Sequence, residues 1–194
     1  MKDAIWQAWY SVIPAETIEE FIKVGDTYPA EPATVGESPE TSATDSNIRK
    51  SDIAWINPMD PDAMTVTQCI NWHAQESNRN CWGFNMGTIV NDIQYTTYHS
   101  EDQGFYDWHI DTFFLNNTRA YDRKVSVIIQ LSDSDDYEGG DFEIDPKYEA
   151  PDREELRKKG TIIVIPSFIQ HRVTPVTKGT RKSIVSWVEG PKWV

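Results

Sequence analysis

The second half of the chain is a succession of short apolar segments separated by turns, and this pattern constrains the fold most. The segments typical of β-strands are GFNMGTIVNDIQYTTY (83–98), FYDWHIDTFF (105–114), RKVSVIIQLS (123–132), DFEI (141–144), TIIVIP (161–166) and RKSIVSWV (181–188). The pattern places no helix between them. Strands that follow one another through turns form antiparallel sheets, so the sequence predicts a mainly β sandwich or barrel.

The N-terminal part has helical patterns instead. Pro14 is suited to the first turn of a helix, and Ile18, Phe21 and Ile22 then form an apolar stripe. We expect this helix to end at Gly25, because glycine is a common residue just past a helix end.

Further along, residues 26–47 are rich in Pro, Ser, Thr, Glu and Gly and offer little to bury, so we expect a mobile loop. Residues 52–56 have a strand pattern, and residues 64–79 have a helical pattern preceded by a Pro-Asp turn. These patterns predict a single domain, in which residues 1–82 supply helical support and a loop while residues 83–190 form the β core.

Charge and cysteine content narrow the classes of partner. Lysine and arginine number 18 against 31 acidic residues, a net charge of −13. Such a chain lacks the basic field that attracts nucleic acid or anionic membranes, so we expect neither as a partner. Two cysteines, Cys69 and Cys81, cannot build a disulfide scaffold. We find no leader pattern and no segment long enough to span a bilayer, and therefore expect a soluble protein of a reducing compartment, the cytoplasm.

The segment at 105–114 combines a strand pattern with residues that bind metals. A period of two sends alternate side chains to opposite faces: Phe105, Asp107, His109, Asp111 and Phe113 to one, and Tyr106, Trp108, Ile110, Thr112 and Phe114 to the other. His109 and Asp111 can then reach a single ion. The pair alone is weak evidence, because His-x-Asp is frequent by chance and a buried histidine often has a carboxylate partner.

A second histidine strengthens this hypothesis. His171 follows the apolar strand 161–166, where a Pro-Ser turn can direct it toward a pocket. Two histidines and one carboxylate are the protein ligands of the facial triad of non-haem iron oxygenases, which leaves iron positions open for substrate and dioxygen. A closed structural zinc site would need a fourth protein ligand, and the sequence offers no obvious one.

The last strand pattern supplies an anion-binding residue. Arg181, Ser183, Val185 and Trp187 share one face of the strand. An arginine facing inward is costly unless it meets an anion, so a dicarboxylate co-substrate is the expected partner of Arg181. The Ser183 hydroxyl would add a hydrogen bond. The alternative is that Arg181 is an exposed residue at the strand start.

Three runs together resemble a known family: YHSEDQGFYDWHID, VSVIIQLSDSDDYEGGDFEI and GTIIVIPSFIQHRVTPVTKGTRKSIVSW. They are similar to the prolyl-4-hydroxylase-like 2-oxoglutarate/Fe(II) dioxygenases, and most similar to the small bacterial and phage members named PKHD-type hydroxylases. The resemblance covers residues 83–188 and includes a Glu-Gly-Gly hairpin. It implies a double-stranded β-helix, or jelly roll, supported by N-terminal helices. It also implies Fe(II), 2-oxoglutarate and O2, with ascorbate as a reductant.

The same resemblance assigns roles to individual residues. It implies that His109, Asp111 and His171 bind Fe(II), and that Arg181 pairs with the distal carboxylate of 2-oxoglutarate. Tyr98 matches a tyrosine that hydrogen-bonds the co-substrate, and Gln130 stands where some relatives carry a second such tyrosine. Trp187, Arg123 and Tyr106 match substrate-side positions, although each residue type is also common in packing. We expect His99 to face away from Tyr98, outside the site, and His73 to serve packing in its helix.

By resemblance, the activity is hydroxylation of a peptide or protein substrate, with proline as the target and succinate and CO2 as products. Asp111 leaves no gap for a halide at the metal, which favours hydroxylation over halogenation. One alternative is a nucleic-acid demethylase of the same superfamily; those relatives carry a second arginine where this chain has Trp187. Another is a non-catalytic metal-binding module that kept the jelly roll. The acidic run SDSDDYEGG lacks the glutamate that ends a calcium loop, so we interpret it as a solvated hairpin turn.

Overall fold

Two antiparallel β-sheets form the body of the protein. The computed structural model describes residues 4–36, 43–87, 93–114 and 119–193. The larger sheet contains, in spatial order, β1 (Gln7–Trp9), β10 (Ile162–Pro166), β7 (Tyr121–Gln130), β12 (Val176–Pro191), β5 (Ile93–His99), β4 (Asp52–Ile56) and β2 (Glu31–Pro32), with β8 (Tyr137–Gly139) paired to β12. The smaller sheet contains β3 (Arg49–Lys50), β6 (Phe105–His109), β11 (His171–Val173) and β9 (Phe142–Ile144). The predicted mainly β jelly roll is therefore confirmed.

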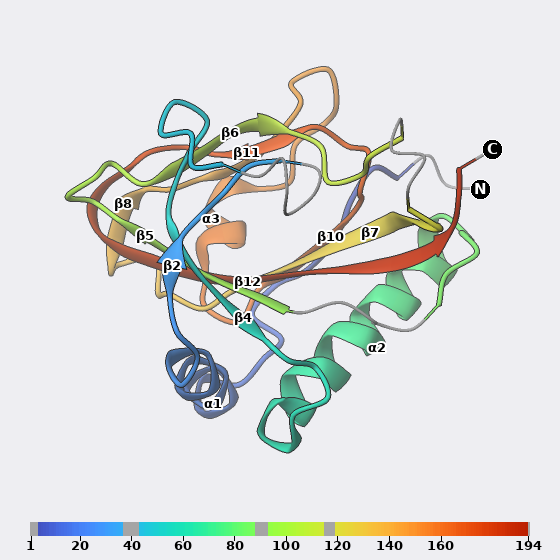
Figure 1. The fold of residues 1–194 in the computed structure, drawn as a ribbon, viewed down its shortest axis with the longest axis horizontal. Helices are drawn as coiled ribbons and strands as arrows, with labels where there is room; N and C mark the ends of the chain where they lie inside the picture. Colours follow the sequence, from blue (N-terminus) through green and yellow to red (C-terminus); the bar gives the residue numbers. More distant parts are fainter. Residues whose placement is uncertain (1–3, 37–42, 88–92, 115–118, 194) are drawn as a thin grey trace.

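Two helices cover the face of the larger sheet that points away from β6 and β11 (Figure 1). They are α1 (Ala15–Asp26) and α2 (Met64–Cys81), and the single turn η1 (Pro61–Ala63) leads into α2. Both were predicted from the sequence. The predicted end of α1 was wrong, because Gly25 lies inside the helix. A Cβ at this position would lie 2.6 Å from the Tyr95 ring, so glycine here allows the tyrosine to pack against the helix.

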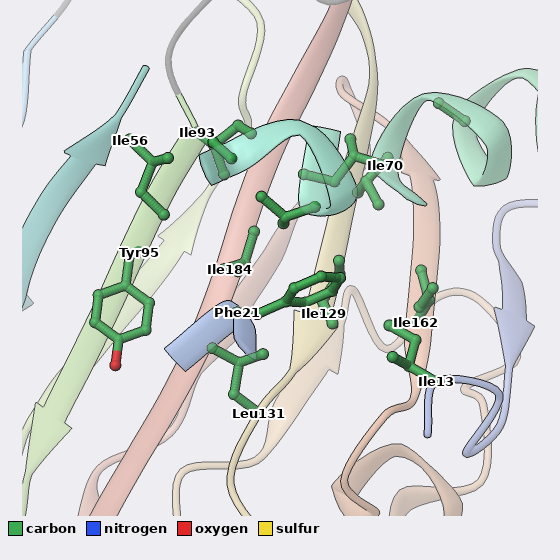
Figure 2. Packing of buried hydrophobic residues seen from close by; sticks show 14 of the residues in the cluster. Ile13, Phe21, Ile56, Ile70, Ile93, Tyr95, Ile129, Leu131, Ile162 and Ile184 are labelled. Carbon is green, nitrogen blue, oxygen red and sulfur yellow. The ribbon is translucent and has the colours of Figure 1, made fainter. Parts of the chain in front are cut away.

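The main hydrophobic core lies between these helices and the larger sheet (Figure 2). Phe21 of α1 and Ile70 of α2 pack against strand residues that include Ile129 and Ile184. All four side chains are at most 1% exposed. Burying such side chains contributes about 1.5–3 kcal/mol each relative to leaving them in water, which makes this layer the principal source of stability.

The N-terminal part contributes more than helices. Strands β1 to β4 all come from it and extend both sheets. Within the expected loop 26–47, β2 pairs with β4, and the Ala33 N–H donates to the Ser51 carbonyl over 2.8 Å. Part of the segment predicted to be a mobile loop thus pairs with the larger sheet, and its mobility stays a prediction; residues 37–42 lie outside the described residues. The strand predicted at 83–98 is observed only as β5, and residues 88–92 are likewise not described.

Strand β6 departs from the predicted period of two. It ends at His109, and its pairing with β11 shifts by one residue: His109 lies opposite His171, but Tyr106 lies opposite Val173. Three steps along β6 therefore match two along β11, which is the count of a β-bulge. The extra residue puts Tyr106 and His109 on the same side and leaves Asp107 exposed. The predicted separation of Tyr106 and His109 onto opposite faces was wrong for this reason.

The Glu-Gly-Gly segment is a crossing and not a hairpin. β8 pairs with β12 in the larger sheet, whereas β9 pairs with β11 in the smaller one. Gly139 and Gly140, with φ of 71° and 62°, make the turn between the sheets. A Cβ on Gly139 would lie 2.1 Å from the Pro175 carbonyl oxygen, so the chain passes too closely for a side chain. The hairpin prediction was wrong because both glycines redirect the strand to another partner.

A short helix, α3 (Arg153–Arg157), lies between β9 and β10, so the expectation of no helix between the strands was wrong at this point. The Asp152 side chain caps its N-terminus by accepting a hydrogen bond from the Glu155 N–H. Arg157 donates to the carbonyl oxygens of Tyr137 and Gly139, both at 2.7 Å, so the helix fastens the β8 crossing.

Candidate metal centre and its pocket

A cavity of about 620 Å³ opens between the two sheets. Side chains from both sheets line it, including His109 and His171 from the smaller sheet and Arg181 from the larger one. Its volume is within the range of small-molecule binding sites. These candidate residues, which are far apart in the sequence, therefore line the same cavity.

The two histidines are held in the same way. His109 and His171 lie directly opposite each other on β6 and β11. The Nδ1–H of His109 donates to the Asp107 carbonyl over 2.7 Å, and that of His171 donates to the Ile169 carbonyl over 2.9 Å. Because each Nδ1 carries the proton, each Nε2 offers a lone pair to the cavity.

Asp111 follows the end of β6 and completes the group. Its backbone N–H donates to the Ser167 carbonyl over 2.8 Å, and the Ser126 hydroxyl donates to its Oδ2 over 2.6 Å. The hydroxyl oxygens of Ser126 and Ser167 are 3.0 Å apart, within hydrogen-bond distance of each other. These contacts fix the carboxylate, which is 6% exposed, in one orientation.

The three side chains converge on a common point. His109 Nε2 lies 3.7 Å from Asp111 Oδ1, and His171 Nε2 lies 3.5 Å from Oδ2. One ligand atom from each residue lies within 4.8 Å of the other two. Two neutral imidazoles and one carboxylate are a donor set that suits a divalent transition metal. The group can therefore hold an ion with positions left open on the cavity side.

The electrostatics of the group favour the metal-binding forms of His109 and Asp111. Burial and the neighbouring His171 hold the pKa of His109 well below its usual range, which favours the neutral imidazole. Burial alone would raise the pKa of Asp111, but His171, His109 and Arg123 together bring it below its usual range. The carboxylate is thus ionised at neutral pH, as a metal ligand must be.

The strand β12 supplies the wall beside this group. Arg181, Ser183, Val185 and Trp187 all line the cavity, as their predicted common face requires. Arg181 is 3% exposed, and its Nη1 donates to the Ser183 hydroxyl over 3.4 Å. Within the described residues no carboxylate lies within 4.0 Å of it. A buried cation without an anion is costly, so this geometry fits an anionic ligand.

Tyr98 and Gln130, the two other predicted co-substrate residues, have different positions. Tyr98 lies opposite Arg181 in the pairing of β5 with β12, and the Arg181 guanidinium is 5.5 Å from its ring centre. Tyr98 lines the cavity. Gln130 does not line it, because its amide donates to the Tyr137 hydroxyl over 3.0 Å and to the Ser132 carbonyl over 3.3 Å. The structure places Tyr98 in the cavity wall, whereas Gln130 lies opposite Ser183 in the pairing of β7 with β12 and outside the cavity lining.

The predicted substrate-side residues all line the cavity. Arg123 stacks on the Trp187 indole at 3.6 Å, and its Nη1 donates to the Asp111 carbonyl over 3.4 Å. Tyr106 stacks on His109 with ring centres 3.5 Å apart. Burial raises the pKa of Tyr106 to about 12, so its hydroxyl stays protonated.

The two remaining histidines lie elsewhere, as predicted. His99 is 3.4 Å from Asp52 and does not line the cavity. His73 is buried in α2, where its Nδ1–H donates to the Cys69 carbonyl over 2.8 Å. Its ring also packs edge-on against Trp72, so it serves packing.

Sequence reasoning missed several residues that line or support the cavity. Arg49, Trp55, Phe113 and Arg119 line it, and Ser126 supports Asp111. Ser126 carried a signal, because it interrupts the otherwise apolar run at residues 125–129. Arg49 and Arg119 carried none, since a single arginine near a strand end is ordinary in any sequence.

Comparison with known proteins places the fold and the site in a family. Residues 93–189 match the family described as the 2OG-Fe(II) oxygenase superfamily. A PKHD-type hydroxylase of Synechococcus sp. (strain CC9311) is 38% identical over 90 residues, which is 46% of this chain and 39% of that protein. The chain thus covers about two fifths of the length of the curated relatives that it matches.

Solved structures share the fold over nearly the whole chain. A prolyl-4-hydroxylase from Pseudomonas putida superposes with a TM-score of 0.71 at 18% identity, covering 96% of this chain and 92% of that one. A prolyl hydroxylase from Trichoplax adhaerens, in complex with a hypoxia inducible factor peptide fragment, gives a TM-score of 0.70 at 17% identity. It covers 95% of this chain and 83% of that one. In the part of the chain that the structure describes, no helix is both long and apolar enough to cross a membrane.

Proposed function

This chain belongs to the 2OG-Fe(II) oxygenase superfamily, and we propose that it hydroxylates a peptide or protein, with proline as the target residue and succinate and CO2 as products. One observation carries the proposal. The Nε2 atoms of His109 and His171 converge on the Asp111 carboxylate in a cavity that also holds Arg181, a buried arginine with no carboxylate within 4.0 Å among the described residues. Family membership implies Fe(II) and 2-oxoglutarate, and both have a matching set of side chains here.

The three ligands would be His109, Asp111 and His171. When bound, Fe(II) supplies the activation of O2 that is coupled to oxidative decarboxylation of 2-oxoglutarate. The protein's contribution is geometric. Main-chain carbonyls orient both imidazoles, and the Ser126 hydroxyl orients the carboxylate, so the ligands are positioned before the metal arrives.

Arg181 would bind the distal carboxylate of 2-oxoglutarate with the two-pronged geometry that a guanidinium offers. Ser183 and Tyr98, which flank it, would contribute hydrogen bonds. The cavity wall around Arg181 is buried, so the charged pair would form away from water, where it is stronger. A direct contact of Gln130 with the co-substrate stays a prediction, since its amide is bound to Tyr137 and Ser132.

The substrate would enter past Trp187, Arg123 and Tyr106. Trp55, which is 44% exposed and 6.3 Å from Trp187 between ring centres, extends this aromatic mouth. Aromatic rings and a cation beside a metal centre suit a peptide segment, because they offer flat apolar contacts together with hydrogen-bond donors. The prolyl hydroxylases among the solved structures support proline as the target.

The proposal is tested by incubating the purified protein with Fe(II), 2-oxoglutarate, ascorbate and a bacterial lysate in air. We expect succinate to form and a set of lysate peptides to gain the mass of one oxygen atom, as detected by mass spectrometry. Removing the metal with a chelator should abolish both signals.

Two variants make the test specific to the proposed metal centre. His109→Ala should bind neither Fe(II) nor Mn(II) stoichiometrically and should form no succinate, whereas His99→Ala, altered outside the cavity, should behave as the wild type. Undiminished succinate formation by His109→Ala would refute the assignment. Stoichiometric iron binding by the wild type without any turnover would instead favour a non-catalytic metal-binding protein.

A further inference from the structure

The arginines of this chain are concentrated in the cavity. The chain has eight arginines and a net charge of −13. Four of the eight line the cavity, namely Arg49, Arg119, Arg123 and Arg181. Among the described lining residues, Asp111 is the only acidic one. Half of the arginines of an acidic protein therefore line one cavity, and the proposed co-substrate accounts for one of them.

The other cavity arginines differ in their partners. Arg119 lies 3.8 Å from the Glu189 carboxylate. Arg49 and Arg123, like Arg181, have no carboxylate within 4.0 Å among the described residues. The arginines outside the cavity all pair with carboxylates, as shown by Arg79 with Glu76, Arg153 and Arg157 with Asp141, and Arg172 with Glu143. Among the described residues, arginines without a carboxylate partner therefore occur only in the cavity.

Arg49 is the best placed of these residues to bind a ligand. It comes from β3 of the smaller sheet and is 7% exposed. Its Nε donates to the Ser51 hydroxyl over 2.9 Å, and its guanidinium lies 4.5 Å from the centre of the Tyr106 ring. Its Nη2 is buried and has no hydrogen-bond partner in the described structure. Because Tyr106 stacks on His109, this free donor lies near the proposed metal centre.

Arg123 lies on the opposite sheet, in β7. Its guanidinium stacks on Trp187, and its Nε is also buried without a partner in the described structure. Leaving such a donor unpaired is costly, more so for a charged group than for a neutral one. Two arginines from opposite sheets therefore line one cavity, and each has one buried guanidinium nitrogen without a partner among the described residues. A ligand that compensated both guanidinium groups would have to be a hydrogen-bond acceptor.

The charges of the proposed loaded site do not supply that acceptor. Fe(II) and Arg181 together carry three positive charges, and Asp111 with doubly ionised 2-oxoglutarate carries three negative charges, so these four groups cancel. The charges of Arg49 and Arg123 remain. A neutral substrate would leave these two buried charges without an anionic partner.

We propose that the substrate of this site is an acidic peptide, in which an Asp or Glu side chain near the oxidised residue binds Arg49 across from Arg123. The identity of the substrate as a peptide rests on the proposed function. A peptide carboxylate fits better than nucleic acid, because a polyanion would extend beyond the cavity over a protein that is strongly acidic overall. The peptide carboxylate and Arg49 would then form an ion pair beside the aromatic side chains at the cavity entrance.

The test is a binding measurement with matched short peptides. Each peptide has a central proline, and one flanking position after another carries Glu in one series and Gln in the other. Binding is measured by calorimetry to the protein loaded with Mn(II), in place of Fe(II), and 2-oxoglutarate, so that no turnover occurs. For at least one flanking position we expect the Glu peptide to bind about 10- to 100-fold more tightly than its Gln counterpart, as a charge-assisted hydrogen bond allows.

Variants of Arg49 test whether this residue causes the preference for Glu peptides. In Arg49→Gln the ratio between Glu and Gln peptides should fall toward one. Arg49→Lys should keep part of the preference, because it keeps the charge but loses the planar fork. The matched control is Arg79→Gln, an exposed arginine whose ion pair with Glu76 is on the surface, and it should keep the full ratio. Thermal unfolding of each variant is measured to verify that it is folded at the temperature of the binding experiment.

Several outcomes would overturn the inference. Equal binding of the two series by the wild type would do so, and so would the absence of measurable binding by either. A single-stranded oligonucleotide that bound more tightly than every Glu peptide would replace the peptide with nucleic acid. Weakened 2-oxoglutarate binding in Arg49→Gln with an unchanged peptide ratio would assign Arg49 to the co-substrate. Because succinate formation is assayed separately, failure of the proposed function is distinguishable from failure of this preference.

Discussion

The two faces of strand β12 form regions with opposite physical characters. On the face toward the helices, Ile184 and Val188 are fully buried in the main hydrophobic core. On the face toward the cavity, Arg181, Ser183 and Trp187 are almost as deeply buried, at 1–5% exposure, but they are polar or carry polar atoms. A single strand thus belongs to a layer that stabilises the fold and to a wall that is suited to binding.

The two faces differ in the charge and number of their unsatisfied polar atoms. On the helix-covered side the buried side chains are mostly apolar; His73 at its margin has its Nδ1–H bound to a main-chain carbonyl, and the Ser186 hydroxyl is a single neutral group without a partner among the described residues. In the described part of the cavity wall, Arg49 Nη2, Arg123 Nε and Trp187 Nε1 are buried without partners. Such groups lower the stability of the ligand-free protein, and ligands that bind them recover the loss. Substitutions on the two faces should therefore have different effects.

The largest expected effect follows replacement of Arg181 by Met. Losing one partner of a buried charged pair costs about 2–5 kcal/mol, so Arg181→Met should weaken 2-oxoglutarate binding by about 30-fold or more. The same change removes an unpaired buried charge from the ligand-free protein. Its free energy of unfolding should therefore stay the same or rise by about 1 kcal/mol. Calorimetry with the Mn(II)-loaded protein and urea denaturation of the apoprotein measure the two quantities.

Arg181→Lys serves as the matched variant, because it retains the charge while losing the guanidinium fork. We expect co-substrate affinity between those of the wild type and Arg181→Met. A marked loss of apoprotein stability in Arg181→Met would contradict the comparison, since it would show that Arg181 is already satisfied within the protein.

A substitution on the helix-facing side of β12 should lower stability without weakening 2-oxoglutarate binding. Ile184 is fully buried beneath the helices, and Ile184→Ala would leave a cavity in the main core. We expect the free energy of unfolding in urea to fall by about 2–5 kcal/mol. The folded variant should bind 2-oxoglutarate as the wild type does. Met59→Ala, altered at an 81% exposed side chain, is the control and should leave stability unchanged.

The parts of this architecture that periodicity governs could be predicted from the sequence. The alternation in β12 correctly grouped Arg181, Ser183, Val185 and Trp187 on the cavity side. The stripe of Ile18 and Phe21 likewise predicted α1 and its buried face. In both cases the signal is local, because every side chain in the element follows one geometric rule.

The parts that depend on pairing between distant segments could not be predicted. The bulge in β6 places Tyr106 beside His109, but it exists only because of how β6 pairs with β11. Arg49 reaches the cavity because β3 pairs with β6, and a sequence pattern of two residues cannot specify that partner. Gly139 and Gly140 resemble a hairpin turn in the sequence, because the local pattern does not show that β8 and β9 pair with different sheets. Tertiary pairing, and not local propensity, determines each of these features.

The turn at Gly140 lies between β8 and β9 and against Arg181, so a substitution there tests how firmly the cavity wall holds this arginine. The φ of Gly140 is 62°, and a Cβ there would lie 2.9 Å from Val176 Cγ2 and 3.0 Å from Arg181 Cδ. Gly83 is a matched control, since its φ of 70° imposes the same backbone strain but no heavy atom lies within 4 Å of its Cβ position. Gly83→Ala therefore reports the cost of backbone strain alone, about 1 kcal/mol.

Gly140→Ala should cost about 1–3 kcal/mol beyond the Gly83→Ala value, because the added methyl group overpacks its neighbours. The neighbour that can move is the flexible arm of Arg181, so part of the strain should be transmitted to the guanidinium. We expect Gly140→Ala to weaken 2-oxoglutarate binding as well as stability, whereas Gly83→Ala should affect stability alone. Urea denaturation and calorimetry of the two variants check both expectations. Equal effects of the two substitutions would show that Arg181 adapts freely, and that the site needs only its charge and not a fixed position.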